Sequence, residues 1–342
     1  MAVQVAEVEN TREDERRPLM TTGNMAWMNL GFFGVQFSFG LTQSAVNPIF
    51  LFLGADAHSL PILNIAGPIT GLLIQPFIGA MSDKTWHPKW GKRKPYILGG
   101  AVVMILILFL FPLVTALWMA VICLWLVDAG NNTAMEPYRA LISDRLRKVQ
   151  IPKGFLIQSM FTGAGAVLAN VSLFVFQKLL TGSSEAGVPT WVFVVFWFGA
   201  VCAIVTVGLA MIRTKEVEPS DEELAHIRSS SKSPRATIAE IADAVKVMPI
   251  GMHKIGLAFL FHNGGGGLLG KPFEFFGLDG LLGKEALSGT IPTTVFVAFQ
   301  AMFAIITVAL ITVFGFLAGG FLTGKYQPGA ALPPTVRSDR IG

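Results

Sequence analysis

The sequence predicts an all-α integral membrane protein, and three features of the chain indicate this class. Hydrophobic residues make up 52% of the 342 residues and charged residues only 14%, whereas about a quarter of the residues of a soluble domain are charged. The mean hydropathy is +0.58. Apolar runs of the length that a bilayer requires recur along the first two thirds of the chain, and basic residues gather in the connections between them.

The apolar runs predict six membrane-spanning helices, at about residues 26–53, 60–82, 95–115, 117–142, 155–180 and 190–212. Their connections alternate in charge. Residues 84–94 and 145–153 are rich in Lys and Arg, whereas residues 54–59 and 181–189 contain neither. Because basic loops stay on the cytoplasmic side, both ends of this six-helix block are expected in the cytoplasm.

The composition divides the chain into five parts. Within the linker after the sixth span, residues 237–248 have apolar positions at helical spacing. This pattern fits either a helix on the membrane surface or a solvated connector helix. The expected parts are a disordered tail (1–22), a six-helix transmembrane unit (23–213), a cytoplasmic linker with an amphipathic helix (214–254), a Gly-rich loop with one additional membrane helix (255–322) and a C-terminal tail (323–342).

Several classes of site are not expected. The net charge of +4 comes from membrane loops and predicts no nucleic-acid partner. Cys123 and Cys202 lie within apolar runs and indicate neither a disulfide framework nor a metal site. His262 and the glycines 264–267 lack the GK[ST] of a phosphate loop. The polar first twenty residues do not resemble a cleavable signal peptide, and we expect no cofactor and no enzyme activity.

The fourth span is the main candidate for a functional site because charged groups inside a membrane are costly and usually face a cavity or a partner. Asp128 and Arg139 are 11 residues apart and return to within about 20° of one helix face. Arg139 could instead be an ordinary charge of the cytoplasmic helix end, as could Asp144. The charged and amide side chains of this span are Asp128, Asn131, Asn132, Glu136 and Arg139.

Two segments resemble signatures of the major facilitator superfamily, in its sucrose-transporter and glycoside–pentoside–hexuronide branch. They are GAMSDKTWHPKWGKRKPY at residues 79–96 and DAGNNTAMEPYRALISD at residues 128–144, and WMNLGFFGVQFSFGLTQSAVNPIF is similar to the first helix of that branch. The resemblance covers about residues 20–260. It implies the six-helix N-terminal half of a facilitator fold, followed by one further membrane helix.

The resemblance also implies cation-coupled symport, with a proton favoured over Na⁺, of a sugar such as sucrose, maltose or another glycoside. Asp128 would accept the proton and Arg139 would couple it to the substrate. Glu136 stands where plant members more often have glutamine. The implied sugar contacts are Gln36, Gln43, Asn131, Asn132 and Glu136, and the implied conformational latch is Asp83, Gly91, Lys92 and Arg93, in which a carboxylate docks on a helix N-terminus or an arginine.

The C-terminal part resembles other families. Residues 261–312 are similar to a fragment of an ammonium transporter, and residues 320–342 to a fragment of an aldo-keto reductase without its catalytic set, which suggests a mosaic. The alternative function is therefore a non-transporting, membrane-embedded truncated or composite chain that retains the transporter fold. Its polar face would meet lipid or pair in a homodimer through the cavity face. The expected location is a bacterial inner membrane, with the N-terminus in the cytoplasm.

Overall fold

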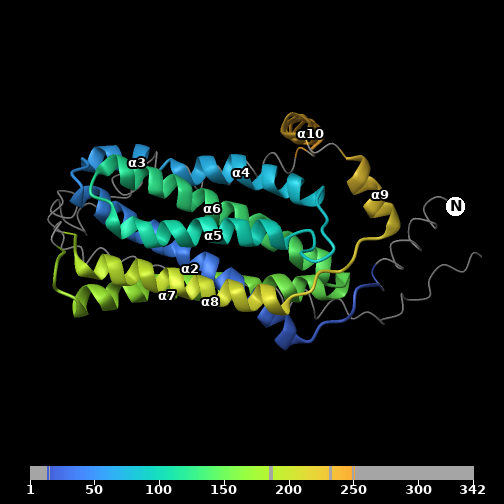
Figure 1. Ribbon diagram of the computed structural model, residues 1–342, viewed down its shortest axis with the longest axis horizontal. Coiled ribbons are helices and arrows are strands. Elements are labelled where there is room, and N and C mark those ends of the chain that lie inside the picture. Colours follow the sequence, from blue (N-terminus) through green and yellow to red (C-terminus); the bar gives the residue numbers. More distant parts are fainter. Residues whose placement is uncertain (1–13, 15, 185–187, 231–232, 249, 251–342) are drawn as a thin grey trace, which may run out of the picture.

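The computed structural model describes residues 14, 16–184, 188–230, 233–248 and 250, and this part of the chain is a helical bundle without a β-strand. The long helices run side by side along the longest axis of the molecule (Figure 1). They are α2 (Thr22–Phe52), α4 (Ala66–Asp83), α5 (Lys94–Leu110), α6 (Leu117–Arg145), α7 (Ile151–Leu179) and α8 (Thr190–Arg213). This architecture agrees with the predicted all-α membrane class.

Each predicted span corresponds to one long helix, although the second differs in detail. A short helix, α3 (Leu60–Leu63), precedes α4, and the two are separated at Asn64 and Ile65. The Asn64 side chain donates to the Leu60 carbonyl at 2.8 Å and to Asn47 Oδ1 of α2 at 2.6 Å. Because this amide ties the end of α3 to α2, the chain turns here before α4 begins. By contrast, α6 continues through Pro137.

The helices differ in how apolar they are. In the described part of the chain, three segments are long and apolar enough to cross a membrane by length and composition, at Lys94–Leu113, Lys148–Leu179 and Thr190–Arg213. The remaining long helices, α2, α4 and α6, carry polar residues within their length, among them Gln36, Gln75 and Asp128. A membrane helix with polar groups is expected to turn them toward protein or a cavity.

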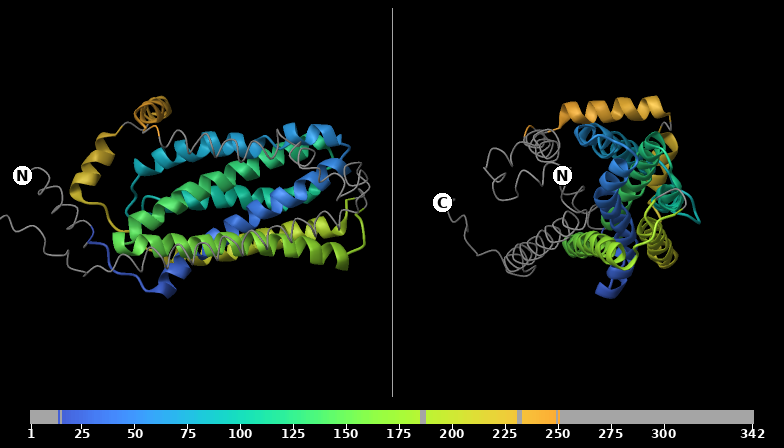
Figure 2. Two further views of the ribbon diagram at one scale, coloured as in Figure 1. Left: turned by 180° about the vertical axis from the view of Figure 1, so that it is seen from behind. Right: turned by 90° about the vertical axis from the view of Figure 1, so that its left-hand side faces the viewer.

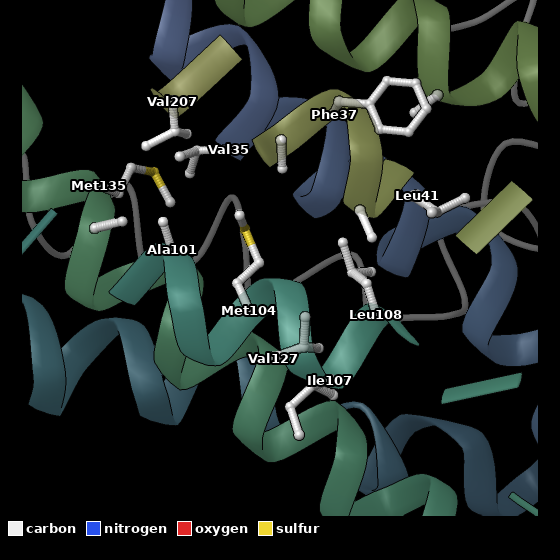
Figure 3. Close-up of a cluster of buried hydrophobic side chains, with 14 of the residues drawn as sticks. Val35, Phe37, Leu41, Ala101, Met104, Ile107, Leu108, Val127, Met135 and Val207 are labelled. Carbon is white, nitrogen blue, oxygen red and sulfur yellow. The ribbon is translucent and has the colours of Figure 1, made fainter. Parts of the chain in front are cut away.

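The core lies where α2 crosses the middle of the bundle, with α7 and α8 on one side and α4, α5 and α6 on the other (Figures 1 and 2). Aromatic pairs join these layers: Phe111 stacks on Phe196 with 4.9 Å between ring centroids. The buried side chains drawn in Figure 3 come from α2, α5, α6 and α8, and include Val35, Phe37, Leu41, Met104, Leu108, Val127 and Val207.

The close crossing of α5 and α6 depends on two glycines, Gly100 of α5 and Gly130 of α6, each of which lies against the backbone of the other helix. A Cβ atom at Gly100 would lie 2.5 Å from the Ala134 nitrogen and 2.6 Å from the Gly130 carbonyl oxygen. Gly100→Ala should therefore cost about 1–3 kcal/mol by overpacking, measured as a lower Tm in mild detergent. The adjacent Gly99 is the matched control, because a Cβ there meets nothing within 4 Å. Equal melting temperatures for the two alanine variants would contradict this account of the crossing.

One end of the bundle bears the basic connections, and we call it the basic end. It holds the loop 84–93, residues 146–150 and the linker helices α9 (Asp221–Ser229) and α10 (Pro234–Val247). Here α10 lies across the bundle, seen end-on in Figure 1 and lengthwise in the right view of Figure 2. Lys84 Nζ pairs with Glu240 Oε2 at 2.5 Å, so α10 is docked on the end of α4.

The predicted amphipathic helix at residues 237–248 thus forms most of α10, and its Ile238 and Val245 are exposed. The predictions for residues 255–322 and 323–342, including the additional membrane helix and both C-terminal resemblances, lie outside the described residues.

Candidate functional site

The polar residues of α6 face α4 along a line of glycines. A Cβ atom at Gly67 would lie 3.5 Å from Asp128 Oδ2, and one at Gly71 would lie 3.7 Å from Asn132 Oδ1. Since glycine has no side chain, the polar groups of α6 have room between the two helices. The facing pairs recur at helical spacing and are Asp128 with Gly67, Asn132 with Gly71, and Glu136 with Gly79. We call this surface the α4–α6 seam.

Asn132 is fixed at the centre of the seam. Its Nδ2 donates to Thr70 Oγ1 at 3.1 Å and to the Asp128 carbonyl at 2.9 Å, and its Oδ1 accepts from Gln75 Nε2 at 2.5 Å. Both amide protons are thus used within the protein. Asn132 therefore acts here as a tie between α4 and α6 rather than as an open hydrogen-bonding group.

Asp128 is the buried charged group of the seam. Its side chain is 1% exposed, no described residue forms an ion pair with it, and its Oδ1 has no hydrogen-bond partner among the described residues. An unpaired carboxylate is costly to bury. The arrangement therefore suits a group that binds and releases a proton or another small cation.

The amides predicted to contact sugar have different surroundings. Gln43 is exposed, and its Nε2 lies 3.8 Å from the position of a Cβ at Gly67, the same point that Asp128 Oδ2 approaches. Gln36 is buried and donates to Met135 Sδ at 3.3 Å. Asn131 is fully buried, and neither of its amide atoms has a partner among the described residues. Of these three amides, only Gln43 is open beside the carboxyl group of Asp128.

Arg139 and Asp128 are not brought together. Eleven residues of helix separate them by roughly 16 Å along the axis. Arg139 is half-exposed and lies 3.7 Å from Glu136 Oε2, with a second contact from its Nη2 to Met135 Sδ at 3.4 Å. The arginine therefore pairs with Glu136 at the basic-end side of the seam.

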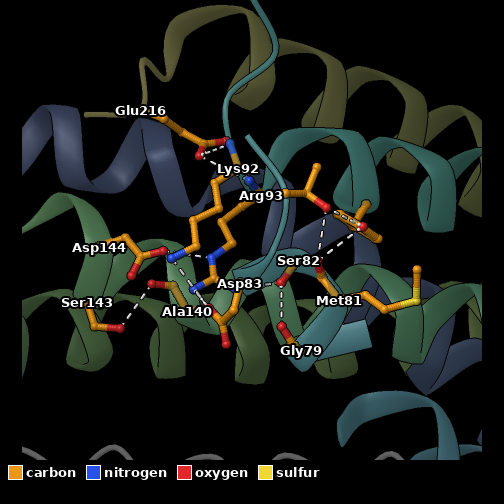
Figure 4. Close-up of polar contacts among 12 residues, drawn as sticks. Gly79, Met81, Ser82, Asp83, Lys92, Arg93, Ala140, Ser143, Asp144 and Glu216 are labelled. Carbon is orange, nitrogen blue, oxygen red and sulfur yellow. Dashed lines mark hydrogen bonds and ion pairs between the residues drawn. The ribbon is translucent and has the colours of Figure 1, made fainter. Parts of the chain in front are cut away.

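The predicted latch residues form a compact ion cluster around Arg93, which is only 4% exposed (Figure 4). Its Nη2 lies 2.5 Å from Asp83 Oδ1 and its Nε 2.6 Å from Asp144 Oδ2. Lys92 Nζ lies 3.5 Å from Asp83 Oδ1, and Arg93 Nη1 also donates to Ser82 Oγ at 2.5 Å. The cluster of Asp83, Lys92, Arg93 and Asp144, which we call the latch, joins the ends of α4, α5 and α6.

The charge of Arg93 depends on these partners. Burial by itself lowers the pKa of the guanidinium, but the ion pairs with Asp144 and Asp83 outweigh it and raise the pKa above its ordinary value. Asp144 is thus a charge at the end of α6 that also pairs with Arg93. No local pattern in the sequence indicates this pair, because 51 residues separate Asp144 from Arg93.

Glu216, in the segment after α8, is a functional candidate that the sequence pattern missed. Its carboxylate accepts hydrogen bonds from the backbone N–H groups of Lys92 at 2.7 Å and Lys94 at 2.8 Å, and from that of Arg93 at 3.0 Å. These are the free donors at the start of α5, where the helix dipole favours an anion. The latch hypothesis expected a carboxylate on a helix N-terminus or an arginine. Glu216 lies on the helix N-terminus, and Asp83 and Asp144 pair with the arginine.

Gly91 makes this contact possible. Its φ of +76° lies in the left-handed region, and a Cβ atom there would lie 2.5 Å from Glu216 Cδ. Gly91→Ala should cost about 1–3 kcal/mol through backbone strain and displacement of Glu216. Gly54→Ala is the matched control, because Gly54 has φ +89° but no neighbour within 4 Å. In unfolding measurements Gly91→Ala should lose more stability than Gly54→Ala, and an equal loss would argue against the Glu216 contact.

Comparison with known proteins agrees with this architecture. The family described as MFS/sugar transport protein matches residues 49–315. A sucrose transport protein of Arabidopsis thaliana is 34% identical over 133 residues, which cover 32% of this chain and 22% of that protein. A second one from the same plant is 26% identical over 206 residues, covering 52% of this chain and 40% of that protein.

A membrane-associated transporter protein of Mus musculus is 26% identical over 171 residues, covering 45% of this chain and 32% of that protein. The chain thus spans well under half the length of these curated relatives. The family match includes the seam and the latch and extends over most of the sequence. These helices therefore belong to an integral membrane protein, and the chain is a member of the MFS/sugar transport family.

Proposed function

We propose that the protein takes part in cation-coupled sugar transport, with a proton as the coupling ion and sucrose, maltose or another glycoside as the substrate. The observation that supports this most directly is Asp128, a buried and unpaired carboxyl group in the middle of a membrane helix. The family match and the relatives named as sucrose transport proteins support the substrate class. The test is sugar uptake into proteoliposomes with an imposed proton gradient, in which Na⁺ alone serves as the comparison.

In this proposal the exposed amide of Gln43 meets the sugar beside Asp128, so that substrate and proton share one region of the seam. Asn132 positions Asp128 through its bonds to α4, and the buried Gln36 and Asn131 become accessible only if the helices move. Arg139 influences the site through Glu136, because the Arg139–Glu136 pair borders the same seam. Hydroxyl groups of a sugar are well matched by such amide and carboxylate groups.

We further propose that residues 23–213 act as one rigid half of the transporter, with the basic end on the cytoplasmic side. The basic connections 84–94 and 145–153 support this orientation. The latch and Glu216 tie the start of α5 to α4, α6 and the linker at that end. They would keep these helix ends together while the half moves as a body.

A further inference from the structure

A thioether on α6 accepts hydrogen bonds from two helices. Met135 is buried and extends toward Val35 of α2 (Figure 3). Its Sδ accepts from Gln36 Nε2 of α2 at 3.3 Å and from Arg139 Nη2, one turn further along α6, at 3.4 Å. Because Glu136 faces α4, Arg139 has contacts on both sides of its helix, toward α2 through Met135 and toward α4 through Glu136.

Sulfur is a weak partner for these two donors. A thioether accepts hydrogen bonds less strongly than a carbonyl or carboxylate oxygen. Among the described residues, Met135 Sδ is the one acceptor within hydrogen-bond distance of the Gln36 amide nitrogen and of the Arg139 guanidinium. The nearest carboxylate oxygen of Glu136 is 3.7 Å from the guanidinium. Both donors are therefore held in place and remain available to a stronger acceptor.

This contact is one of two polar levels between α2 and α6. Gln36 and Gln43 are seven residues apart on α2, and Asp128 and Met135 are seven residues apart on α6. Seven residues return to nearly the same helix face about 10 Å along the axis. Gln36 meets Met135, whereas Gln43 and Asp128 approach the same point beside Gly67. We call these the Met135 level and the Asp128 level, and their separation is comparable with the length of a disaccharide.

We propose that Met135 is a positioning residue for a disaccharide or another two-ring glycoside. In the sugar-free state its sulfur holds the donors of Gln36 and Arg139. When the helices move and the sugar binds, oxygen atoms of one ring take over these donors. This role rests on the proposed sugar transport, in which the other ring is recognised by Gln43 at the Asp128 level. A single ring reaches one level only.

The test is binding of maltose and of methyl α-glucoside to the full chain in mild detergent, measured by isothermal titration calorimetry. Met135→Leu removes the acceptor at similar volume and frees both donors, so it should bind maltose at least as tightly as the unmodified protein. Met135→Gln places an amide oxygen near the donors, holds them more strongly and should lower the affinity for maltose about tenfold. Neither variant should change the affinity for methyl α-glucoside, whose single ring occupies the Asp128 level.

The comparison of the two variants separates this role from a purely structural one. Equal affinities of Met135→Leu and Met135→Gln for maltose would show that an acceptor at this position does not compete with the sugar. An equal loss for both sugars would show a general effect on the fold. Either result overturns the proposal. Met160→Gln, at a position on α7 that is 55% exposed, is the matched control and should change neither affinity.

The Met135→Leu variant also tests the proposal alone. If folded Met135→Leu loses maltose binding, the proposal is wrong, even where Met135→Gln does not fold. A failure of the sugar function itself looks different. In that case the folded, unmodified protein binds neither maltose, sucrose nor methyl α-glucoside, and the role of Met135 fails together with the transport of sugar.

Discussion

Asp128→Asn is expected to abolish sugar uptake driven by a proton gradient while the helical bundle stays folded. The substitution keeps the size of the side chain, and a neutral amide is less costly than an unpaired carboxylate at a position that is 1% exposed. An amide cannot bind and release a proton near neutral pH. The cycle would therefore lose its coupling ion and not its structure.

The measurement is uptake of labelled sucrose and maltose into proteoliposomes, with and without an inward proton gradient. Uptake by Asp128→Asn should fall to the level of protein-free liposomes. Asp56→Asn is the matched control, because Asp56 is an exposed acidic residue in the connection after α2. A parallel series with an Na⁺ gradient identifies the coupling ion.

Three results would change the proposal. If Asp128→Asn still accumulates sugar against its gradient, Asp128 does not bind the coupling ion. If the unmodified protein responds to Na⁺ and not to protons, the carboxylate is a cation ligand rather than a proton carrier. If the folded, inserted protein takes up no sugar under either gradient, the transport function fails and the non-transporting alternative stands.

The sequence was sufficient for the helices because their signal is local. A run of apolar residues is a local signal for a buried helix, and the predicted start of the fourth span at residue 117 coincides with the start of α6, which ends three residues later than predicted. The interruption at Asn64 was missed because it depends on a bond to Asn47, in another helix. Hydropathy does not register such a contact.

The site shows the same division between local and long-range information. The helical period placed Asp128 and Asn132 on one face, and they do share the seam. The same period grouped Arg139 with Asp128, but angular position ignores the distance along the axis, and Arg139 pairs with Glu136 instead. Glu216 could not be assigned, since its partners are 122 to 124 residues away. Glycines at four-residue spacing in α4 were the signal that could have located the seam.

The second large effect concerns the latch, and it depends on which partner is removed. Arg93 is the buried member of the cluster at 4% exposure, whereas the side chains of Asp83 and Asp144 are 57% and 36% exposed. Arg93→Met leaves carboxylates that water can solvate and should cost about 1–3 kcal/mol for the lost charged hydrogen bonds. Asp83→Asn combined with Asp144→Asn leaves a buried guanidinium without a counter-charge and should cost about 3 kcal/mol or more.

Comparing the stability lost by Arg93→Met with that lost by the paired asparagine variant shows whether charge or packing stabilises the latch. If the buried charge dominates, adding Arg93→Met to the paired asparagine variant should restore stability, because it removes the uncompensated guanidinium. Unfolding in mild detergent measures all three variants, and Asp243→Asn at the exposed Lys246–Asp243 pair should have almost no effect. If Arg93→Met is instead the most damaging variant and the triple variant is worse still, Arg93 stabilises the helix ends by its contacts. In that case the carboxylates around it would be replaceable, and the three helix ends would be joined by packing rather than by an ion cluster.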